Sequence, residues 1–287
     1  MNDKLFIKLQ HLVPQHPLSR FVGGIANSRN SFVKNTFIKW FIKRYQVDMS
    51  LAAEENPTAY ASFNDFFTRE LKPGIRPICG EPTAIVCPAD GAVSQLGKIK
   101  NGRVFQAKGQ DFSTAELLGG DAALAEEFAD GEFATIYLSP KDYHRVHMPY
   151  GGKLRSMVSI PGELFSVNAV TAENVERLFS RNERVAAIFD TDIGPMAVVL
   201  VGAMIVAGIE TVWDGQIAPM GSGEPETSLY PYQNITLERG AEMGRFKLGS
   251  TVVVLFAKDK VVWETQFTAG ATTRLGVKLA QKKQLIF

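Results

Sequence analysis

The chain has 287 residues, of which 45% are hydrophobic and 21% are charged. These proportions are ordinary for a folded globular protein and exclude wholesale disorder. Only two cysteines occur, Cys79 and Cys87, so the sequence contains no disulfide framework and favours a reducing compartment. The longest apolar run, 197–209, is shorter than the roughly 18 residues of a membrane-spanning helix, so we expect no such span.

The formal net charge of +1 hides a strong asymmetry. Residues 1–46 carry eight Lys or Arg and one acid, which gives 8 − 1 = +7, so the rest of the chain sums to 1 − 7 = −6. A basic segment attached to a mildly acidic body favours an anionic surface as partner, either a membrane or a nucleic acid.

The first predicted element is a basic helix over 32–45, with a broad apolar arc and a narrow polar stripe. Such a helix can bury aromatic side chains at the lipid boundary while its cations reach phosphates. The expected membrane-binding residues are Phe37, Trp40, Phe41, Lys39, Lys43 and Arg44. A helix packed on the protein body remains an equal alternative for this pattern alone. Nucleic acid is disfavoured, because the apolar arc is wide and no known reader motif is present.

A second helical stretch is predicted over 48–72, and Lys72-Pro73-Gly74 ends it. From Arg76 the sequence pattern changes to short β-type runs separated by Gly, Pro and Asp. The clearest predicted strands are 133–138, 153–160, 197–209 and 251–257, with helical insertions at 114–128 and 172–180. We therefore predict an α+β protein in which a helical, membrane-associating region (1–72) precedes one β-rich, sandwich- or barrel-like catalytic core (73–287).

Three segments carry side chains suited to catalysis, although each has an ordinary structural interpretation. His144 and His147 follow a predicted strand in Tyr143-His-Arg-Val-His-Met-Pro149, where catalytic groups are common but surface histidines are commoner. Asp90 lies in an Asp-Gly turn, and Ser250 follows Gly249 just before a Val-rich strand. Two histidines three residues apart, with no third ligand at a matching spacing, give weak support for zinc.

Considered together, Asp90, His147 and Ser250 can form an activated nucleophile, since such triads occur in any chain order. The Ser250 hydroxyl can reach the carbonyl carbon of Gly249 through a five-membered ring, and glycine permits the strained backbone that this needs. His147 would take the hydroxyl proton, oriented by Asp90. The resulting ester can undergo β-elimination, which cuts the chain between Gly249 and Ser250 and leaves a dehydroalanine that hydrolyses to a pyruvoyl group.

The same segments resemble bacterial phosphatidylserine decarboxylases over essentially the whole chain. The matching motifs are Phe66-Phe-Thr-Arg-Glu-Leu71, Pro88-Ala-Asp-Gly91, Tyr143-His-Arg-Val-His-Met-Pro149, Pro161-Gly-Glu-Leu-Phe-Ser-Val-Asn168 and Leu248-Gly-Ser-Thr251. The Leu-Gly-Ser-Thr tetrapeptide is weak alone, but in register with the Asp-Gly turn and the paired histidines it is specific.

The resemblance implies that Asp90, His147 and Ser250 perform self-processing into a β chain (1–249) and an α chain (250–287). These would stay associated as a heterodimer, which could itself dimerise. His144 matches a histidine that handles substrate and transfers protons. The cofactor would be the covalent pyruvoyl group, with no metal and no pyridoxal phosphate, and phosphatidylserine would react through a Schiff base to give phosphatidylethanolamine.

The resemblance also implies a peripheral protein on the cytoplasmic face of the bacterial inner membrane, with anionic phospholipid and no nucleic acid as partner. The residues alone also allow two other functions. A serine hydrolase with the same triad would keep an intact chain and a free serine. A non-enzymatic membrane-associated β-domain would show no processing at all.

Overall fold

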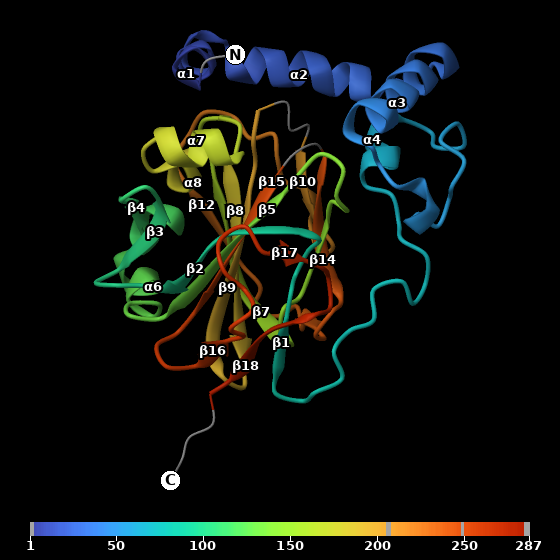
Figure 1. Cartoon of the computed structure of the whole chain (residues 1–287). Coiled ribbons are helices and arrows are strands. Elements are labelled where there is room, and N and C mark those ends of the chain that lie inside the picture. The colour runs from blue at the N-terminus through green and yellow to red at the C-terminus, as the bar shows by residue number, and fades with distance from the viewer. Residues whose placement is uncertain (1–2, 205–207, 248–249, 284–287) are drawn as a thin grey trace.

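The structure, a computed structural model, describes residues 3–204, 208–247 and 250–283 (Figure 1). Gly249, and with it the acyl side of the expected cleavage site, lies outside the described residues. The centre of the core is a large antiparallel sheet with the strand order β12-β7-β8-β9-β15-β5-β2-β17, and β13 also pairs with β7. Smaller sheets in the orders β11-β10-β14-β6 and β1-β18-β16 and the hairpin β3-β4 complete the strands described.

The helices are α1 (Asp3–Leu12), α2 (Gln15–Ala26), α3 (Ser31–Tyr45), the 3-10 turn η1 (Met49–Leu51), α4 (Phe63–Phe67), α5 (Thr114–Leu117), α6 (Ala122–Glu126), α7 (Ala169–Asn174) and α8 (Leu178–Arg181). The strands of the first half are β1 (Ala84–Val86), β2 (Gly91–Lys98), β3 (Arg103–Ala107), β4 (Gln110–Ser113), β5 (Glu132–Leu138), β6 (Arg145–His147) and β7 (Gly152–Ile160). Those of the second half are β8 (Arg184–Thr191), β9 (Gly194–Val201), β10 (Gly208–Thr211), β11 (Gly215–Gln216), β12 (Glu226–Leu229), β13 (Thr236–Leu237), β14 (Glu242–Lys247), β15 (Ser250–Phe256), β16 (Val261–Trp263), β17 (Thr272–Thr273) and β18 (Lys278–Lys282).

The large sheet is buried on both faces, which explains the continuous apolar runs of its central strands. Along β15, Val252 and Val254 face a cluster shared with the smaller sheets, whereas Val253 and Leu255 face a cluster under the helical insertions. Successive side chains of a strand point to opposite faces, so a strand between two apolar layers needs hydrophobic residues at every position.

The N-terminal helices form their own small apolar cluster, separate from the sheets. It contains Ile38 and Phe41 of α3 and Phe63, Phe66 and Phe67 of α4. Asn30 caps α3 and Ser62 caps α4, each accepting hydrogen bonds from the first turn. Figure 1 shows α1 and α2 lying across one end of the core, above the ends of the central strands. No helix in the ranges described combines the length and the apolar character that a bilayer span requires.

The α+β class and the helical N-terminus are confirmed, and the described sheets do not close into a barrel. The prediction of one strand over 197–209 is wrong: β9 ends at Val201, and β10 begins at Gly208 in a different sheet. The predicted helix 172–180 is also two pieces, because Arg177 between them adopts a positive φ of 51°. The insertion 114–128 likewise contains two short helices, α5 and α6.

Glu183, immediately before β8, is a carboxyl group buried at the helical end of the core. Its Oε2 accepts a 2.7 Å hydrogen bond from the backbone N–H of Met220. Burial raises the pKa of Glu183 from 4.5 to about 7, although the Met220 hydrogen bond and the charge of Arg20 oppose the rise. The folded state therefore holds this proton more tightly than the unfolded chain does.

We expect Glu183→Gln to change how the stability of the protein depends on pH. A raised folded-state pKa gives wild type a contribution that is full below pH 4.5 and is lost as the pH rises through about 7. The variant should therefore gain up to about 3 kcal/mol relative to wild type between pH 4.5 and 8, at about 1.4 kcal/mol per unit of pKa shift. Urea unfolding across this range measures the difference. If the free energy of unfolding depended on pH in the same way in both proteins, burial would not raise the pKa of Glu183.

Candidate active site

Ser250 is the first residue of β15 and is completely buried. The strand is held on both sides, by β5 through the pair Ser250–Leu138 and by β9 through the pair Thr251–Val201. The backbone of Ser250 is therefore fixed by the register of the central sheet. Alternation along β15 places its side chain on the same face as Val252, toward the smaller sheets.

His144 is the histidine nearest to Ser250. Its Nδ1 lies 3.4 Å from the Ser250 Oγ, and its Nε2 lies 3.0 Å from the carbonyl oxygen of Ser139. A carbonyl only accepts hydrogen bonds, so Nε2 carries the proton and Nδ1 is left to accept from the Ser250 hydroxyl. Burial lowers the pKa of His144 to about 3, assisted by the positive charge of Arg69. The imidazole is therefore neutral at physiological pH, and it orients the hydroxyl.

The ring of His144 stacks on Phe67, with 4.0 Å between the ring centroids. Phe67 belongs to α4, so the N-terminal helical segment supplies one wall of the site. This contact restricts the imidazole and shields it from water, which contributes to the lowered pKa of His144. The motif that contains Phe67 was recognised in the sequence, but its contact with a histidine far along the chain depends on tertiary packing.

His147 lies on β6, and both of its ring nitrogens are engaged elsewhere. Nδ1 lies 2.8 Å from the carbonyl oxygen of Gly240, and Nε2 lies 3.1 Å from the hydroxyl of Tyr143. Nδ1 therefore donates, and Nε2 accepts from Tyr143, whose pKa is raised by burial so that its phenol keeps its proton. Burial lowers the pKa of His147, while the Gly240 carbonyl and the charges of Glu242 and Asp90 oppose that change.

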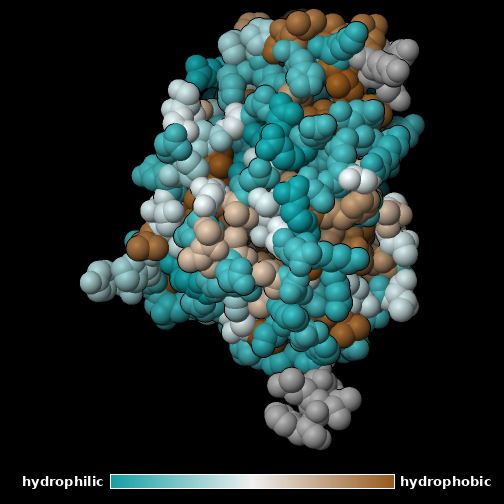
Figure 2. Space-filling view, turned by 90° about the vertical axis from the view of Figure 1, so that its left-hand side faces the viewer, coloured by the Kyte–Doolittle hydropathy of each residue, from teal (hydrophilic) through white to brown (hydrophobic). Residues whose placement is uncertain are grey.

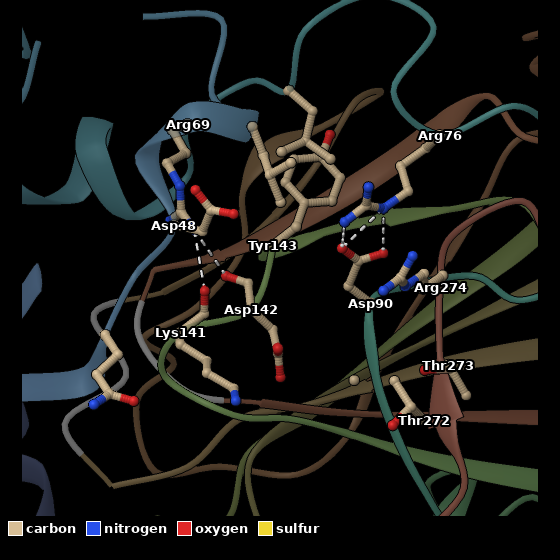
Figure 3. Close-up of a pocket in the computed structure, with 14 residues that line it drawn as sticks. Asp48, Arg69, Arg76, Asp90, Lys141, Asp142, Tyr143, Thr272, Thr273 and Arg274 are labelled. Atoms are coloured by element: carbon tan, nitrogen blue, oxygen red, sulfur yellow. Dashed lines mark hydrogen bonds and ion pairs between the residues drawn. The ribbon is translucent and has the colours of Figure 1, made fainter. Parts of the chain in front are cut away.

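Asp90 is held by an arginine. Arg76 donates from Nε at 3.0 Å and from Nη2 at 2.6 Å to the two carboxylate oxygens (Figure 3). The backbone N–H of Leu275 adds a third hydrogen bond to Asp90 Oδ1. A two-pronged guanidinium contact fixes both the charge and the orientation of the carboxylate. Asp90 and Arg76 line a cavity of about 340 Å³ together with Arg69, Tyr143 and Arg274.

The structure thus assembles the candidate residues in two groups. Ser250 is hydrogen-bonded to His144, whereas Asp90 and His147 approach each other through the backbone, where His147 N–H donates to the Pro88 carbonyl. Within the described parts of the chain, no side-chain hydrogen bond joins Asp90 to His147 or His147 to Ser250. For His147 to act on Ser250, its Nε2 has to leave the Tyr143 hydroxyl.

The expected membrane-binding residues of α3 do not all share one surface. Lys39, Trp40, Lys43 and Arg44 are exposed. Phe41 is instead buried, 5.0 Å from the ring of Phe63, and Phe37 is half-buried and stacked on the same ring at 4.2 Å. The broad apolar arc of this helix serves mainly to join α3 to α4, so Phe41 does not belong to the outer surface.

We expect Arg76→Met to destabilise the protein, because it leaves the Asp90 carboxylate unpaired in a largely buried position. The side chains of this pair are only 14% and 11% exposed, and breaking such a pair costs about 3 kcal/mol. The matched control is Arg103→Met, which breaks the exposed pair Arg103–Asp111 and should cost below about 1 kcal/mol. Denaturant unfolding at pH 7 measures both variants. Equal losses would show that the buried pair has no special role.

Comparison with known proteins gives a consistent result. The family model for phosphatidylserine decarboxylase matches residues 63–281, and a second model, described as PSD, matches residues 5–46. The chain is 60% identical to the phosphatidylserine decarboxylase proenzymes of Pseudomonas fluorescens Pf0-1 and Pseudomonas putida KT2440. These alignments cover 98% and 99% of this chain, and 99% and 100% of the relatives. The chain belongs to the phosphatidylserine decarboxylase family.

Proposed function

We propose that this protein decarboxylates phosphatidylserine to phosphatidylethanolamine, using a pyruvoyl group that it makes from Ser250. The observation that carries the proposal is the buried Ser250 hydroxyl, placed at the start of a rigid strand and in contact with a neutral histidine. The relatives named as proenzymes support a maturation step. A fully buried serine suits attack on its own backbone better than attack on an incoming substrate.

Self-processing begins when the Ser250 Oγ forms a bond to the carbonyl carbon of residue 249 and the peptide C–N bond breaks, giving an ester. Removal of the Ser250 Cα proton then expels the carboxylate of residue 249 and leaves dehydroalanine. Addition of water and loss of ammonia yield the ketone. The register of β15 between β5 and β9 holds Ser250 in place during these steps, so the entropic cost of alignment is met by folding.

His147 is the better candidate for the general base, although His144 is closer to the hydroxyl. A pKa of about 3 makes His144 a weak base. Burial also lowers the pKa of His147, but the Gly240 carbonyl and the charges of Glu242 and Asp90 oppose that change, so His147 is the stronger base of the two. Transfer to His147 requires its Nε2 to exchange the Tyr143 hydroxyl for that of Ser250. His144 then acts by orienting the hydroxyl before cleavage.

After maturation, a pyruvoyl group at position 250 would supply a ketone that takes the substrate amine and accepts the electron pair released with CO2. The surrounding residues fit such a group, because position 250 is shielded from bulk water and His144 lies within reach of its side chain. His144 Nδ1, unprotonated in the neutral ring, would take up a proton and pass it to the reacting carbon, while Phe67 keeps the imidazole in stacked contact.

The helical end of the molecule is the proposed membrane surface. An ordinary surface helix keeps its large apolar side chains inward, but α1 and α2 leave several of theirs exposed. Gln10 and Ser19 are buried, whereas Leu12 and Phe21 are 79% and 69% exposed. Figure 2 shows hydrophobic side chains gathered at this end. Exposed apolar groups beside Lys39, Lys43 and Arg44 suit the boundary of an anionic bilayer.

Ser250→Ala should remain a single 31.5 kDa species on a denaturing gel, because no hydroxyl is available to attack the chain. The matched control is Thr251→Val, which removes the adjacent buried hydroxyl and should still cleave. We expect His147→Ala to stay uncut. His144→Ala should still cleave, more slowly because the hydroxyl loses its orienting contact, but should release no CO2. Efficient cleavage of Ser250→Ala would rule out self-processing. An uncut His144→Ala beside a cleaved His147→Ala would reverse the proposed roles.

Replacing Leu9, Leu12 and Phe21 with Ser should reduce binding to phosphatidylserine-containing vesicles while leaving self-cleavage intact. Each buried apolar side chain contributes about 1.5–3 kcal/mol to partitioning, so the triple variant should lose well over tenfold in affinity. The control is the double variant Val262→Ser/Val277→Ser, since these exposed residues lie at the opposite end near β16 and β18. Vesicle co-sedimentation distinguishes the two. Equal binding by both would place the lipid contact elsewhere.

A further inference from the structure

Three consecutive residues of the core, Leu164, Phe165 and Ser166, are each contacted by one side chain of the helical segment. Gln15 Oε1 accepts a 2.7 Å hydrogen bond from Leu164 N–H. His11 packs edge-on against the ring of Phe165, with 4.8 Å between the ring centroids. Next to them, Gln10 binds Ser166. The end of α1 and the start of α2 are thus attached to one short loop residue by residue.

The contact of Gln10 with Ser166 is the most specific of the three. Gln10 Nε2 donates to the Ser166 hydroxyl at 2.7 Å, and Gln10 Oε1 accepts from the Ser166 backbone N–H at 2.9 Å. The glutamine is only 4% exposed, although it belongs to a helix whose leucines face outward. Burying an amide is costly unless both of its ends are paired, and here both are paired with a single residue.

The loop is joined in turn to the strand end beside Ser250. Asn182, which is completely buried, accepts from Phe165 N–H at 3.1 Å and donates to the carbonyl oxygens of Phe165 and Gly202 at 2.8 and 2.9 Å. Gly202 follows Val201, the strand partner of Thr251, and therefore lies beside Ser250. Hydrogen bonds from Gln10 to Ser166 and from Asn182 to Phe165 and Gly202, joined by the Phe165–Ser166 peptide bond, thus lead from α1 through the loop to the neighbour of Ser250.

We infer that Gln10 is a positioning residue that couples the lipid-facing helix α1 to the surroundings of Ser250. This inference rests on the proposed function. A substrate whose acyl chains stay in a bilayer meets the reactive group only if helix and loop keep a fixed separation. The Gln10–Ser166 contact sets that separation, whereas a soluble substrate is free of this constraint. Loss of the contact should therefore impair turnover of bilayer substrate more than turnover of soluble substrate.

The test compares Gln10→Met, which keeps the length of the side chain but not its hydrogen bonds, with wild type. Turnover is measured on phosphatidylserine in phosphatidylcholine vesicles and on a short-chain phosphatidylserine below its micelle concentration. We expect kcat on vesicles to fall about tenfold for loss of the paired hydrogen bonds. Soluble turnover, vesicle binding and self-cleavage should stay close to wild type. Gln233→Met, at an exposed glutamine outside this contact, is the matched control.

Two further variants keep the test decisive. Gln10→Glu retains an acceptor for the Ser166 N–H and hydroxyl, so it should recover most of the vesicle turnover. Should Gln10→Met melt early, Gln15→Met leaves the Gln10 side chain in place, removes the neighbouring bonds to Leu164 N–H and to the Gln10 carbonyl, and allows the same comparison. Equal losses on vesicle and soluble substrates, or no loss on either, would overturn the coupling. Failure of the proposed function is distinguishable, since wild type itself would then release no CO2 from either substrate.

Discussion

The burial of Ser250 at the first position of β15 is the constraint on which the rest of the site depends. Antiparallel pairing on both sides fixes the backbone at this residue, and the apolar layers above and below prevent a shift in register. A slip of one residue would exchange Ser250 and Thr251 between the faces and move the hydroxyl away from His144. The Val-rich sequence that follows Ser250 therefore positions this hydroxyl as well as filling the core.

Two histidines three residues apart acquire different properties from their surroundings alone. His144 lies between Phe67 and the central sheet without a nearby carboxylate, and burial keeps it neutral. His147 lies on β6, where burial also lowers its pKa but the Gly240 carbonyl and the charges of Glu242 and Asp90 oppose that change. A pair of titratable groups whose environments push their pKa values apart is the usual arrangement for dividing acid and base roles. The roles proposed here, His147 as general base and His144 as the group that orients the hydroxyl, follow that rule. Proximity to Ser250 alone would make His144 the base.

The sequence predicted the fold class and a strand over 251–257, one residue from the observed β15 (Ser250–Phe256), because both depend on local composition and periodicity. It could not predict that the apolar run 197–209 breaks at Gly202, since both parts are equally hydrophobic and only pairing with different sheets separates them. The orientation of Phe41 was misjudged for a similar reason. A wide apolar arc contains no information on which part meets another helix and which meets lipid.

The sequence motifs identify the candidate catalytic residues, but they do not predict which of these residues contact one another. The hydrogen bond from Ser250 to His144 joins residues 106 positions apart. The motifs also do not predict that Arg76 holds Asp90 or that Phe67 stacks on His144, because both contacts depend on tertiary packing. Gln10 gave no signal at all, because a glutamine in a basic amphipathic segment looks like solvent-exposed polar surface. Its importance appears only when both ends of its amide are found paired inside the protein.

In α1 and α2 several large apolar side chains are exposed while polar side chains are buried, and the buried ones attach these helices to the core. These helices present leucine and phenylalanine outward and glutamine and serine inward, so the hydrogen bonds that would ordinarily face water are used to hold the loop next to the reactive strand end. A helix that was amphipathic in the usual sense could either anchor to lipid or pack on the core, but it could not do both through specific polar contacts. The inward polar face gives directionality, because hydrogen bonds fix a distance and an angle whereas apolar packing permits sliding. The residues beneath these helices, including the end of the strand at Ser250, are thereby kept at a constant distance from them.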